Sequence, residues 1–318
     1  MRMLFIFGYP RSGTTLLRSV LSQHTQITLR NEPELFFGFH NAGVLNADKI
    51  QLSKPLLDRM RQIGMCQKYL NQRTAYVEEL VGGTFKQSDL YLKLLNCESN
   101  AVIGEKSLNN LFFTRRIREL YPDSCFLWLI RDPRSAVWSR IIKQLNAKGD
   151  SFSSERWVEY IGQTLRHAKL WKAWHAWGFK NLRNLTHVQQ LRFEDFLTDP
   201  KANLLETLRL LDLEFEEEMM RPEKRSNDPV FQSDGAYAHK NIPRALDPSR
   251  IKAYSDMPKQ LIYMVEQVCR REMMLFGYAL EKPKVTISDR LKIRFAKIRS
   301  YLDVSRSVRK HLHSRGAM

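Results

Sequence analysis

A group of glycine, hydroxyl and arginine residues lies near the start of the chain, where residues 8–15 read GYPRSGTT. The two glycines have the spacing of a P-loop, in which backbone N–H groups and the N-terminus of the following helix bind a phosphate. The hydroxyl groups can donate further hydrogen bonds, and the arginine carries a planar fork of donors. The spacing predicts a phosphate site, with an ordinary strand–turn–helix connection as the alternative. The candidate binding residues are Arg11, Ser12, Gly13, Thr14 and Thr15.

Thr14 stands where the P-loop of a nucleoside triphosphatase has its lysine. That lysine reaches the β- and γ-phosphates, and no acidic partner for Mg²⁺ is evident after a strand. A ligand with one 5′-phosphate and no metal ion therefore fits this loop better than a triphosphate does. A kinase or NTPase with a degenerate loop is the alternative, and Mg²⁺-dependent turnover of ATP would favour it.

Short apolar runs alternate with helix-like segments along the chain, which is typical of an α/β fold. We predict a P-loop-type parallel β-sheet flanked by helices, with a helical insertion and a basic helical C-terminal tail. Because ligands of such sheets bind beyond the carboxyl ends of the strands, the polar residues after each run are the candidates for a site. The predicted strands are Met3–Phe7, Val102–Ile103, Cys125–Ile130 and His187–Leu191.

The length of 318 residues and the apolar content of 43% predict one large domain with insertions. We assign a single domain to residues 1–281, with the helical insertion at about 31–100, and a basic tail to residues 282–318. The stretch 214–247 is poor in periodic apolar residues. It predicts a long loop of the kind that covers a site.

The net charge of +17 is concentrated in the tail, which carries eleven Lys or Arg and two Asp. A basic body indicates anionic ligands and a basic tail indicates an anionic surface, whereas nucleic acid is not singled out. The tail predicts a basic amphipathic helix, which either lies on an anionic membrane or packs on its own domain with a solvated face. The apolar residues at helical spacing are Leu291, Phe295, Ile298 and Leu302.

Two motifs resemble the sulfotransferase family. PRSGTT at residues 10–15 is similar to the loop that binds the 5′ end of 3′-phosphoadenosine 5′-phosphosulfate (PAPS), and RDPRSAVWS at residues 131–139 is similar to the second motif of the family. The resemblance implies a PAPS-dependent sulfotransferase in which Arg131 and Ser139 hold the 3′-phosphate of the donor. A strand-end arginine paired with a carboxylate is the alternative for Arg131.

Two further stretches are family-like. GEKS at residues 104–107 resembles an element whose lysine points at the sulfuryl group, which implies this role for Lys106. LRFEDF at residues 191–196 resembles a segment in which Phe193 replaces the usual tyrosine and keeps a ring for packing near the adenine. The resemblance also implies that the long loop closes over the donor and that Lys240 supplies a cation, with a solvated lysine as the alternative.

Glu32 is the candidate general base, because it aligns with the catalytic glutamate of tyrosylprotein sulfotransferases and related bacterial enzymes. In-line sulfuryl transfer needs such a base for the acceptor hydroxyl, and it needs cations near the leaving phosphate oxygen. We assign the cation role to Arg11 and Lys106. The alternatives are that Glu32 pairs with Arg30 or caps a following helix, and that Lys106 is a surface lysine paired with Glu105.

The N-terminal apolar stretch, Met3–Phe7, is too short for a signal segment or a membrane span. The four cysteines form no CxxC pair, which fits a reducing compartment. We expect a cytoplasmic enzyme, with peripheral contact at the inner membrane surface left open. The expected acceptor is a carbohydrate, lipid or other hydroxyl compound, and no metal is expected. A non-catalytic protein that binds nucleic acid or an anionic glycan is the remaining hypothesis.

Overall fold

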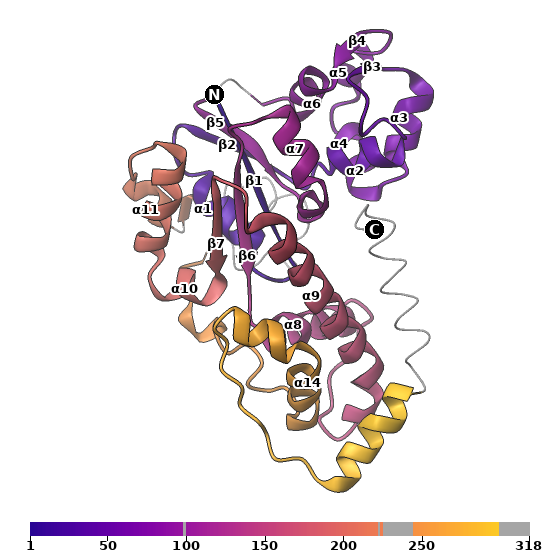
Figure 1. The fold of residues 1–318 in the computed structure, drawn as a ribbon, viewed down its shortest axis with the longest axis vertical. Helices are drawn as coiled ribbons and strands as arrows, with labels where there is room; N and C mark the ends of the chain where they lie inside the picture. Colours follow the sequence, from indigo (N-terminus) through magenta and orange to yellow (C-terminus); the bar gives the residue numbers. More distant parts are fainter. Residues whose placement is uncertain (98–99, 222, 225–243, 299–318) are drawn as a thin grey trace.

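The computed structural model describes residues 1–97, 100–221, 223–224 and 244–298 of the chain. A five-stranded parallel sheet lies at its centre, with the strand order β2-β5-β1-β6-β7 (Figure 1). The predicted α/β fold with a parallel sheet flanked by helices is confirmed. The strands are β1 (Arg2–Gly8), β2 (Ile27–Asn31), β5 (Val102–Lys106), β6 (Cys125–Ile130) and β7 (Val188–Arg192).

Both faces of the sheet are covered, because successive side chains of each buried strand point to opposite sides. Phe5, Phe7 and Phe126 pack into one core, whereas Leu4 and Leu127 pack into the other. Outside the insertion, the helices of the first core are α7 (Thr114–Leu120), α8 (Pro133–Asn146), α9 (Ile161–Leu182) and α14 (Lys259–Leu275). Those of the second core are α1 (Thr14–Leu21), α10 (Phe193–Thr198) and α11 (Pro200–Leu211).

The predicted insertion is mainly helical, but it also contains a small two-stranded antiparallel sheet that the sequence did not predict. Phe36 and Tyr91 attach it to the main sheet, since each ring centroid lies 6.1 Å from that of Phe5. Strand β2, immediately before the insertion, was also missed. The elements are α2 (Leu35–Asn41), β3 (Lys49–Gln51), α3 (Lys54–Arg61), α4 (Gly64–Asn71), α5 (Thr74–Glu79), β4 (Thr84–Lys86) and α6 (Gln87–Leu95).

Short 3₁₀ turns connect several of these elements, and residues 287–298 form a last described helix after α14. Most of the predicted long loop, including Lys240, lies outside the described residues. In the part of the chain that the structure describes, no helix has both the length and the apolar character needed to cross a bilayer. The 3₁₀ turns are η1 (Leu108–Phe113), η2 (Trp157–Tyr160), η3 (Glu217–Met220) and η5 (Pro248–Arg250).

His175 is a fully buried polar residue in the middle of α9. Its ring centroid lies 5.7 Å from that of Trp128, 4.4 Å from that of Trp171 and 5.6 Å from that of Phe276. Neither ring nitrogen has a hydrogen-bond partner among the described residues. Burial lowers the pKa of His175 to about 3. The imidazole therefore acts as a neutral aromatic ring in the core.

We expect His175→Phe to stabilise the protein, and most strongly at acid pH. The folded state keeps this ring neutral down to about pH 3, whereas histidine in an unfolded chain takes up a proton below about pH 6.5. Between these values the unfolded state binds more protons than the folded state. As the pH falls through this range, the free energy of unfolding therefore decreases by up to about 1.4 kcal/mol per pH unit. Thermal unfolding at two pH values tests this: the gain in Tm should be larger at pH 5.0 than at pH 7.5, and equal gains would contradict it.

Candidate functional site

The carboxyl ends of the five parallel strands bring the predicted site residues to one edge of the sheet. Glu32 directly follows β2, Lys106 ends β5, and Arg11 lies in the loop after β1. Arg131 directly follows β6, and Phe193 directly follows β7. Since these strands are neighbours in the order β2-β5-β1-β6-β7, residues from five distant parts of the chain form one row.

The loop between β1 and α1 has the tight backbone of a phosphate-binding turn. Arg11 and Gly13 have positive φ angles of 73° and 94°, and α1 begins at Thr14. The ring of Phe193 lies against Gly13 so closely that a Cβ atom there would come within 2.3 Å of it. Ser12 is fully buried, and its hydroxyl has no hydrogen-bond partner among the described residues. An anion bound at this turn would supply an acceptor atom for the Ser12 hydroxyl.

Arg131 connects this loop to the rest of the site. Its guanidinium donates to the backbone carbonyls of Arg11 and Arg250, each at 2.9 Å, and stacks on the ring of Phe193 with the guanidinium carbon 4.5 Å from the ring centroid. The indole of Trp171 donates to the carbonyl of Arg131 at 3.0 Å, which fixes the end of β6. The Nε of Arg131 is buried without a partner among the described residues. The alternative pairing with a carboxylate is therefore not what positions this arginine.

Burial lowers the pKa of Arg131 to about 10, with the nearby positive charge of Arg250 as the next cause. Burial also lowers the pKa of Arg11, and again Arg250 contributes. A bound anion close to Arg131 and Arg11 would oppose this lowering of their pKa values and stabilise their charged forms. The arrangement favours a ligand with more than one negative charge.

Ser139 lies beside the loop, on the first half of α8. The Nε of Arg11 donates to its hydroxyl oxygen at 3.1 Å. Together with the bond from Arg131 to the carbonyl of Arg11, this contact joins the two predicted motifs into one hydrogen-bonded unit. The sequence predicted the residues of both motifs, but not this direct link.

Glu32 and Lys106 form an ion pair in which Nζ and Oε1 are 2.5 Å apart. The lysine side chain is 1% exposed and the glutamate side chain is 25% exposed, so the carboxylate faces the more open side. Burial lowers the pKa of Lys106, and the charge of Glu32 opposes that shift. A base candidate and a cation candidate therefore lie in contact, although 74 residues separate them in the sequence.

The alternative partners considered for this pair are wrong. Arg30 donates to backbone carbonyls at the end of α6 rather than to Glu32. Helix α2 begins at Leu35, with Glu34 at its N-cap position, so Glu32 does not cap it. Glu105 points to the other side of β5, where it accepts hydrogen bonds from Tyr91, Ser107 and Asn110, at 3.0, 2.9 and 2.7 Å.

Two cations of the site were missed by the sequence analysis. Lys143 lies on α8, one helical turn after Ser139, and burial lowers its pKa, with Arg11 and Arg140 as further causes. Glu32 and Lys106 also act on its charge, which places Lys143 near the ion pair. Arg250 comes from η5, near the segment that lies outside the described residues. No sequence motif marks this arginine, and only the folded structure shows that it lies at the site. For Lys143, the spacing of four from Ser139 was an available signal.

Phe193 is almost fully buried, with its ring between the turn at Gly13 and the guanidinium of Arg131. It thus supports the loop and the arginine, and its predicted contact with an adenine stays a prediction. Lys240 lies outside the described residues. Within the described part of the chain, no three His, Cys, Asp or Glu side chains gather closely enough to hold a metal ion.

A family model described as the sulfotransferase family matches residues 4–217. The chain belongs to the sulfotransferase family. This sulfotransferase is 21% identical over 265 residues to a putative protein-tyrosine sulfotransferase of Caenorhabditis briggsae, covering 80% of this chain and 81% of that protein. It is 24% identical over 232 residues to a protein-tyrosine sulfotransferase of Drosophila melanogaster, covering 72% of this chain and 42% of that protein.

Solved structures share the fold of the sulfotransferase. The sulfotransferase domain of the Synechococcus PCC 7002 olefin synthase superposes with a TM-score of 0.63 at 18% identity, covering 88% of this chain and 96% of that domain. The sulfotransferase domain of the curacin biosynthetic pathway gives a TM-score of 0.59 at 21% identity, covering 88% and 98%. The prediction of a sulfotransferase enzyme is confirmed by the family match.

Proposed function

We propose that the protein transfers the sulfuryl group of PAPS to an acceptor hydroxyl by in-line displacement. The observation that carries this proposal is the link between two anion-binding groups at neighbouring strands. Arg131 donates to the carbonyl of Arg11, and Arg11 donates to Ser139. A ribose with phosphate groups at both its 5′ and 3′ positions matches two such groups set side by side.

The donors of the site fit this ligand. Ser12 Oγ and Arg131 Nε are buried without partners among the described residues, which is unfavourable unless a ligand brings acceptor atoms. In our proposal the backbone of residues 11–15 and their hydroxyl groups bind the 5′-phosphosulfate. Arg131 and Ser139 bind the 3′-phosphate. Lys240 adds a cation from the segment outside the described residues.

The ion pair supplies the groups that the transfer needs. Glu32 takes the proton of the acceptor hydroxyl while its oxygen attacks sulfur and the bond from sulfur to the bridging phosphate oxygen breaks. Lys106 and Arg11 stabilise the negative charge that develops on this phosphate oxygen. Adenosine 3′,5′-bisphosphate (PAP) leaves, and the sulfate ester keeps the transferred group. Because Glu32 and Lys106 are already 2.5 Å apart, base and cation face the same point.

The acceptor is proposed to be a carbohydrate, a lipid or another hydroxyl compound. The names of the curated relatives add the tyrosine hydroxyl of a protein as a further candidate. Residues 33–97 of the insertion follow Glu32 directly, so we propose that this region contributes the acceptor pocket. The cytoplasm remains our proposed location.

Calorimetry with the full chain tests the donor class without knowledge of the acceptor. We expect PAP to bind at least about 100-fold more tightly than AMP, because two added charge-assisted hydrogen bonds contribute roughly 3 kcal/mol. ATP, with or without Mg²⁺, should bind no better than AMP. Tighter binding of Mg²⁺–ATP than of PAP would contradict the proposal and favour a degenerate kinase.

A further inference from the structure

The helix formed by residues 287–298 is fixed to the domain by one of its faces. Thr286 and Asp289 cap its N-terminus reciprocally: the backbone N–H of each donates to the side chain of the other, at 3.1 and 3.0 Å. Ile293 is 2% exposed and packs into the core. Arg290 lies over the ring of Tyr263 on α14, with the guanidinium carbon 5.9 Å from the ring centroid. The orientation of the helix is thereby defined.

The opposite face of this helix is an apolar stripe open to solvent. Its four residues follow one another at spacings of four, four and three, so they share one side of the helix. Their exposed fractions lie between 48% and 78%, and they make up four of the nine large hydrophobic residues exposed on the described part of the chain. A concentration of this kind marks an interaction surface. The stripe consists of Ile287, Leu291, Phe295 and Ile298.

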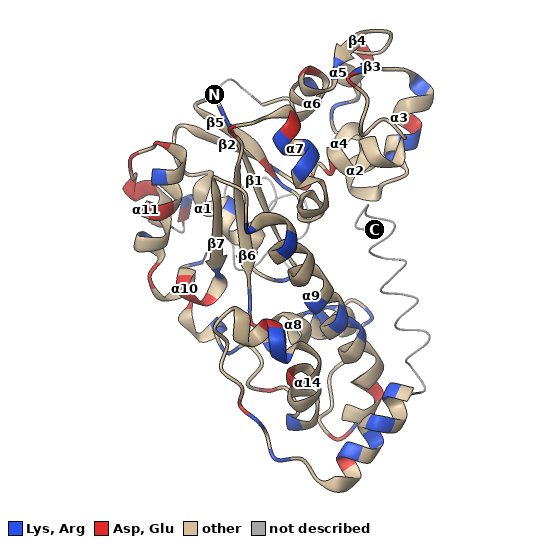
Figure 2. Cartoon of the chain, viewed as in Figure 1, with Lys and Arg blue, Asp and Glu red and all other residues tan. Residues whose placement is uncertain are grey.

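Positive charge borders the stripe. The same helix carries four basic residues, and its one acidic residue, Asp289, points inward to the cap. Figure 2 shows these blue segments on the last described helix, at the lower right of the view. An apolar stripe between basic side chains is the pattern of a helix that lies in the surface of an anionic bilayer. The basic residues are Arg290, Lys292, Arg294 and Lys297.

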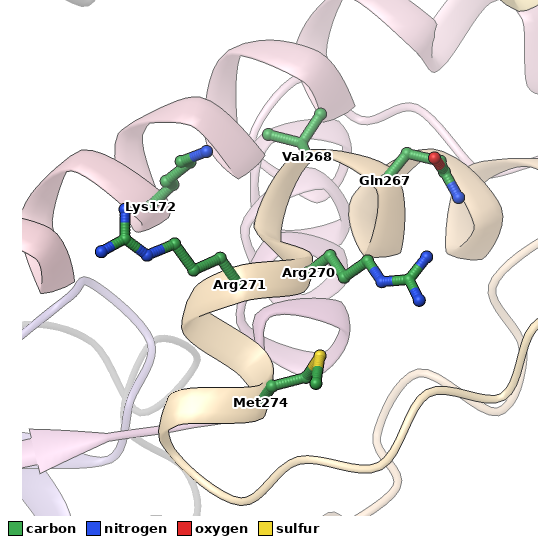
Figure 3. Close-up of a pocket in the computed structure, with 6 residues that line it drawn as sticks. All are labelled: Lys172, Gln267, Val268, Arg270, Arg271 and Met274. Carbon is green, nitrogen blue, oxygen red and sulfur yellow. The ribbon is translucent and has the colours of Figure 1, made fainter.

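A basic pocket lies on the neighbouring helices α9 and α14. It has a volume of about 440 Å³ and is lined by Lys172, Arg270 and Arg271 together with the exposed Met274 (Figure 3). On α14, Arg270 and Met274 follow Tyr263 at helical spacing, so they share its side of the helix. On α9, Lys172 comes one turn after Lys169, and the charge of Lys169 acts on Lys297 of the last helix. The pocket therefore continues the side of the domain on which the last helix lies.

We propose that the stripe and this basic pocket dock the enzyme on an anionic lipid bilayer. The stripe enters the interface between headgroups and acyl chains, and the cations around it and in the pocket bind lipid phosphates. A second copy of the chain would bring its own basic border against this one, which like-charge repulsion disfavours. Residues 299–318 carry five basic residues and one acidic residue, so they are an equally unfavourable cover for the stripe. The proposal is independent of the acceptor and of the donor.

Co-sedimentation of the full chain with vesicles tests the proposal. Vesicles of phosphatidylcholine and phosphatidylglycerol at 3:1 should bind the protein, and vesicles of phosphatidylcholine alone should bind it at least about tenfold less. Phe295→Asp should lower binding at least about tenfold, because it places a charge in the buried stripe. The matched control is Met65→Asp on α4, an exposed apolar residue of the insertion, which should leave vesicle binding unchanged.

Two double variants with the same change in net charge distinguish lipid binding by the last helix from a general effect of lost positive charge. Lys292→Glu with Arg294→Glu should abolish binding, whereas Lys49→Glu with Lys86→Glu, which changes the net charge equally on the β3–β4 pair, should lower it much less. Calorimetry with PAP checks that every variant is folded. The proposal is overturned if the full chain stays in the supernatant with both vesicles, or if Phe295→Asp binds as wild type does. It is also overturned if light scattering shows a dimer that Phe295→Asp dissociates while vesicle binding is unaffected.

Discussion

Replacing Glu32 with glutamine is expected to lower kcat by about 10²–10⁴-fold, the range over which a positioned general base contributes. Glutamine keeps the shape and can still contact Lys106, but it cannot take the proton of the acceptor. The nucleotide site is not altered, so the Kd of PAP should change less than about threefold. The measurement is the release of PAP from PAPS with the best acceptor from a panel of phenolic, carbohydrate and lipid hydroxyls.

Glu34→Gln is the matched control for this variant. Glu34 is a nearby carboxylate of the same loop, but it is buried and accepts a hydrogen bond from Asn109 at 2.8 Å. Its amide analogue should keep most of the activity. If Glu32→Gln retains more than a tenth of the wild-type kcat, or if Glu34→Gln is the variant that loses it, Glu32 is not the base.

Replacing Arg131 with alanine should weaken the binding of PAP by about 100-fold or more, and the binding of AMP by much less. The guanidinium is buried, and its Nε is unpartnered in the described structure, so it can give the 3′-phosphate charge-assisted hydrogen bonds that AMP cannot accept. Calorimetry with both nucleotides gives the ratio of the two losses. That ratio is informative even though Arg131 also holds the carbonyls of Arg11 and Arg250.

A structural loss alone would weaken both nucleotides equally. Arg131→Lys is the second variant: it keeps the charge but lacks the planar fork, so it should lie between wild type and alanine for PAP. Ser139→Ala should weaken PAP in the same direction by a smaller factor, since it removes one hydroxyl. Equal losses for PAP and AMP in Arg131→Ala would mean that this residue does not bind the 3′-phosphate.

The sequence predicted the central sheet well where strands are apolar throughout, as at Cys125–Ile130. It missed β2, because ITLRN is a short edge strand in which only alternate residues are buried. The consequence reaches the site. Without β2 beside β5, nothing in the sequence brings Glu32 next to Lys106, and local charge pairs with Arg30 and Glu105 are the natural alternatives.

Residue identity at the site was predictable from motifs, whereas the contacts between motifs were not. Arg11 and Ser139 are 128 residues apart, and their hydrogen bond exists only because β1 and β6 are neighbours in the sheet. Phe193 illustrates the same limit. The sequence showed that a phenylalanine replaces the usual tyrosine at this position. That its ring lies against Gly13 depends on the pairing of β6 with β7.

The strand order β2-β5-β1-β6 fixes the distance between the two ends of the candidate site. Glu32 and Arg131 follow strands that are three positions apart, a separation of about 14 Å set by backbone hydrogen bonding between strands. Substitutions in the surrounding loops leave this interval unchanged. In our proposal residues 33–97 contribute the acceptor pocket, so a change of acceptor in that region would leave the spacing between Glu32 and Arg131 constant.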